Sequence, residues 1–499
     1  MFWLGTGVLM VVMARVAAKD GGRAGLWFAV LASMLLMPTW ITWRFGSLTM
    51  DFRAVGQVLG LMSLALAWSG PYPPSAERPR RRLLLADLMI LVLFLVQVYT
   101  QRRIGRFGPL TAPDIARRWV LPYVAGRVFL GSADDVARVL PVASKLLMGL
   151  ATFAVVEAVT KVHLVNRLLG KNFALLEGGE GYRWGLKRAQ GPLDHPIFFG
   201  MMLVLLWPWV DEAARRAWRG RGEKWWLALA GMMAAAVVVT VSRGAQISLV
   251  GTVGVTAFFR MPQYRLRMFV AAVVLGGGGY VAKHELSEVL SKWAGEKAEE
   301  VRIVEINGNE YEYSGTNHRV LLFKAYEQAM VDTGAFGFGY EMLGIELEEA
   351  VAQRFSSIDD HYIRFLLQYG YVGLGAFVLL SLVSLIDLAR VAWDVRQEVS
   401  GLAAAQFGGF AMVTVGLLSV WFSPDFGAVW LFSAGLAGNL RCLPPSEAPA
   451  APEPPTDSDA DEPEEPAGFA PPPLRPRIVP AHPPYRTPTP TPTQRQGPL

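Results

Sequence analysis

The chain has 499 residues, of which 52% are hydrophobic and only 18% are charged, and its formal net charge at pH 7 is +5. Soluble domains usually carry about 25% charged residues, so this deficit argues against a soluble protein and indicates a lipid-facing surface. The basic excess does not predict a nucleic-acid partner, because much of it lies in short loops between apolar blocks, where Lys and Arg orient membrane helices.

Apolar blocks of helical length recur from the N-terminus to residue 440. A bilayer core of about 30 Å needs roughly 20 apolar residues in a helix, and backbone groups in hydrocarbon must be hydrogen-bonded within their own segment. We therefore predict an all-α fold, a polytopic integral membrane protein with about 12–13 transmembrane helices in a domain spanning residues 1–440. The first block lacks a basic run before it and a clear cleavage site after it, so it is interpreted as a helix and not as a signal peptide. The predicted spans are 2–18, 25–43, 54–70, 83–100, 118–131, 139–160, 196–212, 225–241, 246–259, 268–282, 362–386, 402–421 and 426–440.

The Lys and Arg residues of the short loops predict how these helices are oriented. Basic clusters at 78–82, 215–224, 260–267 and 390–396 all fall in the cytoplasm in one scheme, which places the loops 161–195 and 283–361 outside. The basic residues from Arg102 to Arg118 fit this scheme badly, because it places them outside as well. Either the short span at 118–131, which contains Pro122, is a tilted or partly re-entrant piece, or this loop has a function that outweighs the bias.

The large periplasmic loop predicted at 283–361 contains several elements. Residues 284–297 have the pattern of an amphipathic helix, and alternating apolar residues around Asn307-Gly308 predict a β-hairpin. Helical spacing over 319–331 predicts a further helix, which the glycines from 334 to 339 end. The Pro-rich segment 441–499 cannot bury enough apolar surface to offset its ordering entropy, so we predict a disordered cytoplasmic tail.

No sequence pattern predicts a cofactor or a metal. The glycine run 276–279 has no Walker lysine and no preceding strand, so its predicted role is close helix packing. No Cys or His pair has zinc-ligand spacing. Asp359-Asp360 is interpreted as a helix N-terminus, with divalent-cation binding as the alternative. The single Cys442 excludes an internal disulfide framework.

Charged residues at the predicted outer membrane border are the candidates for chemistry, because an Arg at a helix centre costs about 2.5–3.5 kcal/mol on insertion and usually faces a cavity or a partner. Arg188 precedes a turn and a helix start, Arg243 lies between two apolar blocks, Arg319 begins the loop helix, and His361 begins the next span. Each alone also fits a snorkelling Arg, a solvated helix end or an interfacial His. Together they suit a reaction on a diphosphate-linked lipid, because Arg forks recognise phosphates and a neutral His is the usual general base.

Four stretches, in this order, resemble the O-antigen ligase and O-antigen (exopolysaccharide) polymerase superfamily of bacterial envelope glycosyltransferases. They are 188–196 (RAQGPLDHP), 242–245 (SRGA), Arg319 followed by 337–340 (GFGY), and His361-Tyr362 running into 370–373 (GYVG). The family often has Asn after the His, where this chain has Tyr362.

The resemblance implies a helical bundle in the bacterial inner membrane, with a large periplasmic loop over the active site. It implies metal-independent glycosyl transfer, without a cofactor, from an undecaprenyl-diphosphate-linked glycan to a polysaccharide, lipid A core or other acceptor. The residues carried over by motif are Arg188, Arg243 and Arg319, which bind the diphosphate, and the catalytic His361, which orients or deprotonates the acceptor hydroxyl. The alternatives are a transporter or flippase of lipid-linked sugars, for which mid-membrane polar residues and internal repeats are expected, and a non-catalytic envelope assembly factor.

Overall fold

The computed structural model describes residues 2–38, 40–46, 48–68, 82–169, 181–281, 302–306, 308–313, 318–342, 345, 351, 355, 357–394 and 397–443. The helix predicted at 284–297 and residues 444–499 of the predicted tail lie outside these residues.

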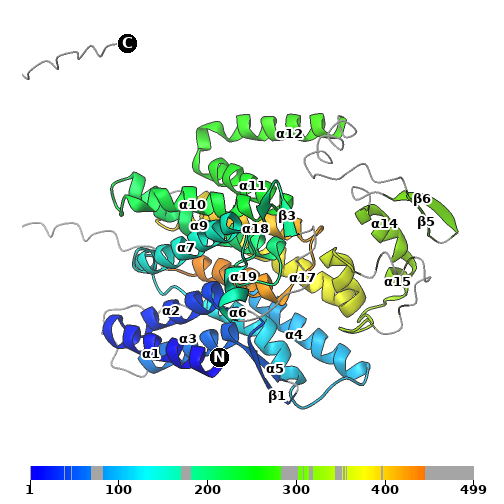
Figure 1. Cartoon of the computed structure of the whole chain (residues 1–499), viewed down its shortest axis with the longest axis horizontal. Helices are drawn as coiled ribbons and strands as arrows, with labels where there is room; N and C mark the ends of the chain where they lie inside the picture. Colours follow the sequence, from blue (N-terminus) through cyan, green and yellow to red (C-terminus); the bar gives the residue numbers. More distant parts are fainter. Residues whose placement is uncertain are drawn as a thin grey trace, which may run out of the picture. The chain divides into compact units, whose positions relative to one another are not determined.

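Helices make up nearly all of the regular structure described (Figure 1). They are α1 (Phe2–Asp20), α2 (Gly22–Leu36), α3 (Phe52–Trp68), α4 (Leu85–Arg103), α5 (Thr111–Ile115), the π-helix η1 (Ala116–Val120), α6 (Leu121–Arg127), α7 (Asp134–Thr160), α8 (Leu164–Leu169), α9 (Pro196–Trp218), α10 (Trp225–Val239), α11 (Arg243–Arg260), the 3-10 helix η4 (Pro262–Tyr264), α12 (Arg265–Val281), α14 (His318–Ala325), α15 (Glu327–Asp332), α17 (His361–Trp393), α18 (Ser400–Gly416) and α19 (Pro424–Arg441). The strands pair as antiparallel hairpins, β1 (Thr42–Phe45) with β2 (Leu48–Asp51), β3 (Tyr182–Arg183) with β4 (Leu186–Lys187), and β5 (Arg302–Ile306) with β6 (Asn309–Tyr313).

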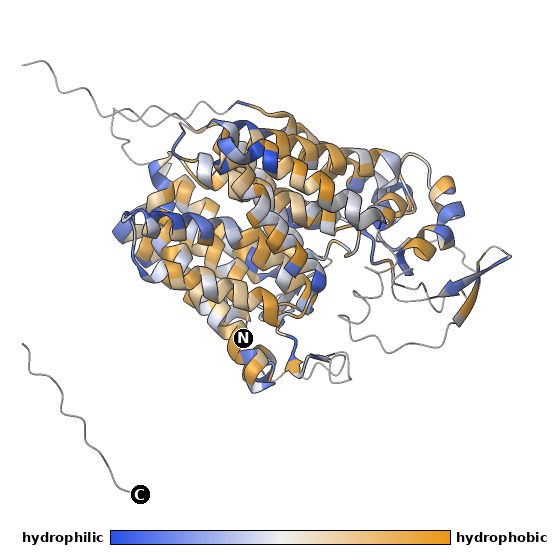
Figure 2. Cartoon of the chain, turned by 90° about the horizontal axis from the view of Figure 1, so that it is seen from above, coloured by the Kyte–Doolittle hydropathy of each residue, from blue (hydrophilic) through white to orange (hydrophobic). Residues whose placement is uncertain are grey.

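Each predicted span overlaps a helix of the structure. In the described residues five helices (α1, α4, α7, α9 and α17) are long and apolar enough to cross a membrane, and α2, α3 and α10 are apolar but shorter. Hydrophobic residues run along these helices in Figure 2. The chain is therefore an all-α polytopic membrane protein, as predicted.

Three predicted elements have different bounds in the structure. α2 ends at Leu36, not at 43, because Met37 precedes Pro38, which disfavours a helical backbone there; Met37 has φ −95° and ψ 132°. The span at 118–131 is irregular, since it consists of the end of the π-helix η1 and of α6, which ends at Arg127. The helix predicted over 319–331 is interrupted at Tyr326 (φ −105°, ψ 7°), which separates α14 from α15.

The hairpin predicted in the large loop is confirmed. Ile306 pairs with Asn309, and Gly308 has φ 74°, a backbone conformation that glycine adopts without steric cost. Its residues Val304 and Ile306 pack in one buried cluster with Leu322 of α14 and Leu367 of α17, so part of the large loop is anchored to the helix that begins at His361.

Glycines allow close helix packing in this structure, but at positions outside the predicted run 276–279. A Cβ added at Gly277 or Gly278 would meet no atom within 4 Å, so these two residues of α12 pack against nothing in the described chain, and that prediction was wrong for them. A Cβ added at Gly126 of α6 would lie 2.0 Å from the Phe432 carbonyl oxygen of α19, and one at Gly435 would lie 2.0 Å from the Tyr123 carbonyl oxygen. The absent side chains thus let α6 and α19 approach closely.

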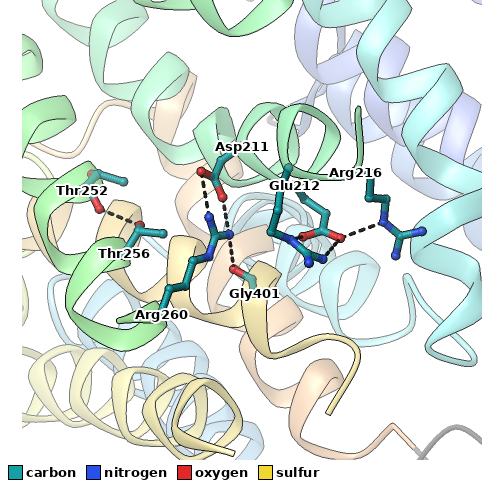
Figure 3. A network of polar contacts seen from close by, with 8 residues as sticks. Asp211, Glu212, Arg216, Thr252, Thr256, Arg260 and Gly401 are labelled. Atoms are coloured by element: carbon teal, nitrogen blue, oxygen red, sulfur yellow. Dashed lines mark hydrogen bonds and ion pairs between the residues drawn. The ribbon is translucent and has the colours of Figure 1, made fainter. Parts of the chain in front are cut away.

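A polar network joins one end of α9, α11 and α18 (Figure 3). Arg260 donates to Asp211 and, over 2.7 Å, to the Gly401 carbonyl, while Arg216 donates to Glu212 over 2.8 Å. Two basic clusters that the sequence scheme assigns to the same side, around 215–224 and 260–267, therefore meet at one end of the bundle. This pairing also places compensating carboxylates beside the cations at that end.

Candidate active site

The segment that carries Arg188 is fixed by backbone contacts. Arg188 follows β4, is buried, and donates from Nε to the Thr240 carbonyl over 3.3 Å. The N–H of Ala189 also bonds to the Val239 carbonyl over 3.0 Å. Because Thr240 is three residues before Arg243, these contacts hold the first two predicted Arg residues near each other.

A buried carboxylate, which the sequence analysis did not identify, anchors the same segment. Glu157, at the end of α7, is fully buried, and its Oε2 accepts from the backbone N–H of Gly191 at 2.9 Å and of Gln190 at 3.3 Å. Its Oε1 lies 2.6 Å from His163 Nδ1. The only available signal was a Glu among apolar residues near the end of a predicted span, which usually marks a functional or anchoring position.

Arg243 and Arg319 come from different elements and lie within electrostatic range of each other. Arg243 is the first residue of α11, and Arg319 in α14 donates to the Ser419 carbonyl over 3.5 Å. Desolvation by neighbouring protein atoms lowers the pKa of Arg319, the charges of Asp359 and Asp360 raise it, and that of Arg243 lowers it. Arg243 and Arg319 therefore lie near the segment before α17, which contains the carboxylates of Asp359 and Asp360.

His195 connects this cluster to Arg188. It caps α9, with Nδ1 accepting from the Ile197 N–H over 3.1 Å, and Pro196 occupies the first helical turn as predicted. Burial lowers the pKa of His195 to about 4, with Arg188 acting in the same direction and Asp359 against it. His195 and Arg319 are thus both within electrostatic range of Asp359, which precedes α17, while Arg188 lies within range of His195 and Arg243 within range of Arg319. We name Arg188, Arg243 and Arg319 the outer Arg cluster.

His361 is the first residue of α17, and contacts from Asp360 and from Phe422 fix its backbone and its side chain. Asp360 caps the helix by accepting from the Ile363 N–H over 3.0 Å, which confirms the interpretation of the Asp pair as a helix N-terminus. The His361 side chain is 3% exposed, and its Nδ1 accepts from the Phe422 N–H over 3.4 Å. Its Nε2 is buried and has no hydrogen-bond partner in the described chain, so it is the ring atom available to a substrate.

The His361 ring lies in a pocket whose cations differ from those of the outer Arg cluster. The volume of this His361 pocket is about 80 Å³. Its lining includes Asp51, Arg53, Gln57, Arg117, Arg118, Trp119, Tyr340, His361, Arg364, Gln368, Tyr369, Trp421 and Phe422. It shares Arg118, Trp119 and Tyr340 with an adjoining pocket of about 340 Å³, whose lining includes the exposed Arg106 and Glu341.

Trp421 packs against residues beside both cationic groups, the outer Arg cluster and the Arg residues of the His361 pocket. Trp421, in the turn between α18 and α19, packs edge-on against Phe198, whose ring also contacts His195. The guanidinium of Arg364 lies 4.5 Å from the centre of the Trp421 ring. The structure therefore brings the three predicted Arg residues together, and it places His361 beside a second set of cations that was not assigned from the sequence.

The segments around two glycine-containing motifs, 337–340 and 370–373, are hydrogen-bonded to each other beside the His361 pocket. α17 is interrupted at Gly370 (φ 69°, ψ −171°), and the carbonyls of Leu367 and Gln368 accept from Phe338 (2.7 Å) and Gly339 (2.9 Å). A Cβ at Gly370 would lie 2.3 Å from the Ala335 carbonyl carbon, so only glycine fits. This pairing carries Tyr340, the next residue of the loop, into the pocket lining.

The basic residues that fit the topology scheme badly have partners at this end of the bundle. Arg103 donates to the Gly337 carbonyl of the glycine loop, and Arg106 lies 3.3 Å from Glu341. Arg117 lies 2.9 Å from a carboxylate oxygen of Asp51. These contacts give the basic residues of this loop partners within the chain.

The described residues contain no group of three or more His, Cys, Asp or Glu side chains placed to hold a metal ion. The fold and the site thus define a polytopic membrane protein with a buried His and clustered Arg side chains at one end of its bundle. Residues 228–378 match the family model described as O-antigen ligase. The match includes Arg243, Arg319 and His361 and leaves out Arg188. No curated protein matches the chain. This match indicates an enzyme of the ligase or glycosyltransferase type, with lipid-linked glycans and acceptors as its general partners.

Proposed function

We propose that this protein transfers a glycan from an undecaprenyl-diphosphate carrier to a hydroxyl of a polysaccharide, lipid A core or other acceptor. The reaction takes place at the periplasmic face of the bacterial inner membrane and needs no metal. The observation that carries the proposal is the convergence of the outer Arg cluster on the segment that begins α17, next to His361. The family match over 228–378 supports the same class of reaction.

In the proposed reaction the bond between the anomeric carbon and the diphosphate oxygen breaks, and a bond forms between that carbon and the acceptor oxygen. The lipid diphosphate leaves with the bonding electron pair, and direct displacement inverts the anomeric centre. Arg188, Arg243 and Arg319 stabilise the negative charge that develops on the diphosphate, and planar guanidinium groups match its oxygens bidentately.

His361 orients the acceptor hydroxyl or takes its proton. Because Nδ1 accepts from the Phe422 N–H, the neutral ring with this contact carries its proton on Nε2. Proton transfer to Nε2 therefore requires the other tautomer and the loss of the 3.4 Å contact, whereas orientation by a hydrogen bond does not.

The test uses purified, folded full-length variants, a lipid-linked donor and candidate acceptors. Arg319→Ala is expected to weaken donor binding by about tenfold or more, since charge-assisted hydrogen bonds contribute about 1.5–3 kcal/mol. His361→Ala is expected to abolish transfer and to leave donor affinity unchanged. Arg390→Ala, at the opposite end of α17, is the control and should match the wild type. Normal donor binding in Arg319→Ala and Arg243→Ala would place the diphosphate elsewhere.

A further inference from the structure

A separate cavity, which we name the Arg260 pocket, lies at the end of α17 remote from His361. Trp393, the last residue of α17, packs edge-on against Phe259, the residue before Arg260, with 5.8 Å between the ring centres. The volume of the pocket is about 370 Å³. The charged residues of its lining are Arg215, Arg216, Arg219, Arg221, Arg260, Asp134 and Glu398.

Three of the five Arg side chains are paired with carboxylates of α9 (Figure 3). Arg215 and Arg216 both donate to Glu212 over 2.8 Å. Arg260 donates to Asp211 over 3.1 Å, and its Nε is buried without a hydrogen-bond partner in the described chain. These ion pairs hold three guanidinium groups in fixed positions in the lining.

Arg219 and Arg221 differ from these three residues. Arg219 is the C-cap of α9, Arg221 follows two residues later, and both are exposed. Neither side chain forms an ion pair with a described residue, and the acidic lining residues Asp134 and Glu398 form none either. The contacts of the described chain therefore leave the guanidinium groups of Arg219 and Arg221 available to a ligand.

The chemistry of the lining suits a phosphate ester. Planar guanidinium groups bind phosphate oxygens bidentately. A volume of about 370 Å³ holds roughly 25 to 37 water molecules at 10–15 Å³ each, so it has room for a phosphate and for a polar group attached to it. Asp134 and Glu398 supply acceptors for hydroxyl groups in that attached part.

Exposed aromatic residues near the pocket indicate the source of such a ligand. Trp218, the last residue of α9, is 82% exposed, and Trp393 and Tyr264 are also exposed. Trp and Tyr are enriched where a membrane protein meets the lipid headgroups, and basic pockets between membrane helices bind phosphorylated headgroups. The surroundings of the pocket therefore favour a lipid over a soluble phosphate.

We propose that the Arg260 pocket binds the phosphate of a glycerophospholipid headgroup from the surrounding bilayer, with Arg219 and Arg221 as its main cationic contacts. The pocket and the His361 site lie at different ends of α17, so this inference does not rest on the proposed function.

The proposal is tested on delipidated full-length protein in detergent by native mass spectrometry, which resolves each bound lipid. The probes are phosphatidylglycerol, a diacylglycerol with the same acyl chains, and glycerol 1-phosphate, which lacks the chains. Phosphatidylglycerol should bind about tenfold more tightly than diacylglycerol, and the double variant Arg219→Gln, Arg221→Gln should lose this preference because it loses charge-assisted hydrogen bonds. The control Arg138→Gln, Arg390→Gln removes the same charge from exposed Arg residues outside the pocket and should keep the preference.

Three outcomes contradict the proposal. Equal affinity of the wild-type chain for phosphatidylglycerol and diacylglycerol would overturn it, and this result does not depend on any variant folding. An equal loss in the two double variants would also overturn it, because binding would then follow net charge and not the pocket. If glycerol 1-phosphate displaces phosphatidylglycerol at equal concentration, the pocket recognises a free phosphate ester, and the assignment to a lipid is wrong.

Discussion

His361 can act on the acceptor in two ways, and comparing His361→Gln with His361→Ala distinguishes them. A Gln side chain places an amide N–H near the position of Nε2 and so can orient a substrate oxygen, but it has no basic nitrogen. The Ala variant removes both capacities. The ring is 3% exposed and packed against Phe365, Phe377 and Phe422, so Gln also fills most of the space that Ala would leave empty.

The magnitudes favour proton transfer over orientation alone. Giving up the 3.4 Å contact between Phe422 N and His361 Nδ1 leaves a donor without its acceptor, which costs about 1–3 kcal/mol where the donor is buried. A positioned general base contributes about 10²–10⁴-fold in rate, which corresponds to roughly 3–5 kcal/mol. The gain exceeds the cost of changing tautomer, so we expect His361 to act as the base.

Both variants should therefore lose about 10²–10⁴-fold in turnover and retain donor-lipid affinity. The assay is single-turnover transfer from a purified lipid-linked donor, with donor binding measured in parallel on the same preparations. If His361→Gln keeps more than about a tenth of wild-type turnover while His361→Ala does not, the base assignment is refuted and only the orienting role remains.

Three further predictions address the residues around His361. Arg243→Lys keeps the charge but loses the planar fork, so donor-lipid affinity should fall by about tenfold in a binding titration; unchanged affinity would show that the fork is not used. Gly370→Ala forces a Cβ to within 2.3 Å of the Ala335 carbonyl carbon at φ 69°, so the melting temperature and turnover should both fall. In the control Gly375→Ala the added Cβ would meet nothing within 4 Å, so this variant should resemble the wild type. Equal melting temperatures for the two variants would contradict the role of the kink at Gly370. The pKa of His195 is lowered from 6.5 to about 4, so between these pH values the unfolded chain binds a proton that the folded chain does not. The stability that neutral His195 contributes is therefore present above pH 6.5 and is lost as the pH falls towards 4. The melting temperature of His195→Asn should depend less on pH over this window than that of the wild type, and an equal dependence would contradict the prediction.

The sequence predicted the helical content and the candidate Arg residues because both depend on local patterns. Long apolar blocks indicate membrane helices wherever they pack, and the Arg residues lie at the ends of such blocks. The end of α2 was missed although Pro38 was visible, because hydropathy alone extended the span beyond it. The break at Tyr326 between α14 and α15 has no comparably strong local signal.

The second set of cations could not be predicted from any one stretch. The His361 pocket joins residues near 51–57, 117–122, 361–369 and 421–428, which meet only when α3, α5 to α6, α17 and α19 pack together. The glycine motifs at 337–340 and 370–373 were both identified, but the hydrogen bonds of each motif to the residues just before the other depend on tertiary structure. The one available signal was indirect, since the basic run from Arg102 to Arg118 fitted the topology scheme badly.

That misfit has a physical explanation in the ion pairs of these Arg residues. Arg117 and Arg118 are partly compensated by Asp51 and Asp114, which lowers the cost of holding cations at a border where the positive-inside bias disfavours them. Arg103 also donates to the Gly337 carbonyl, so the basic residues of this loop have acceptors within the chain. These contacts explain why the basic residues stay at this end of the bundle against the bias.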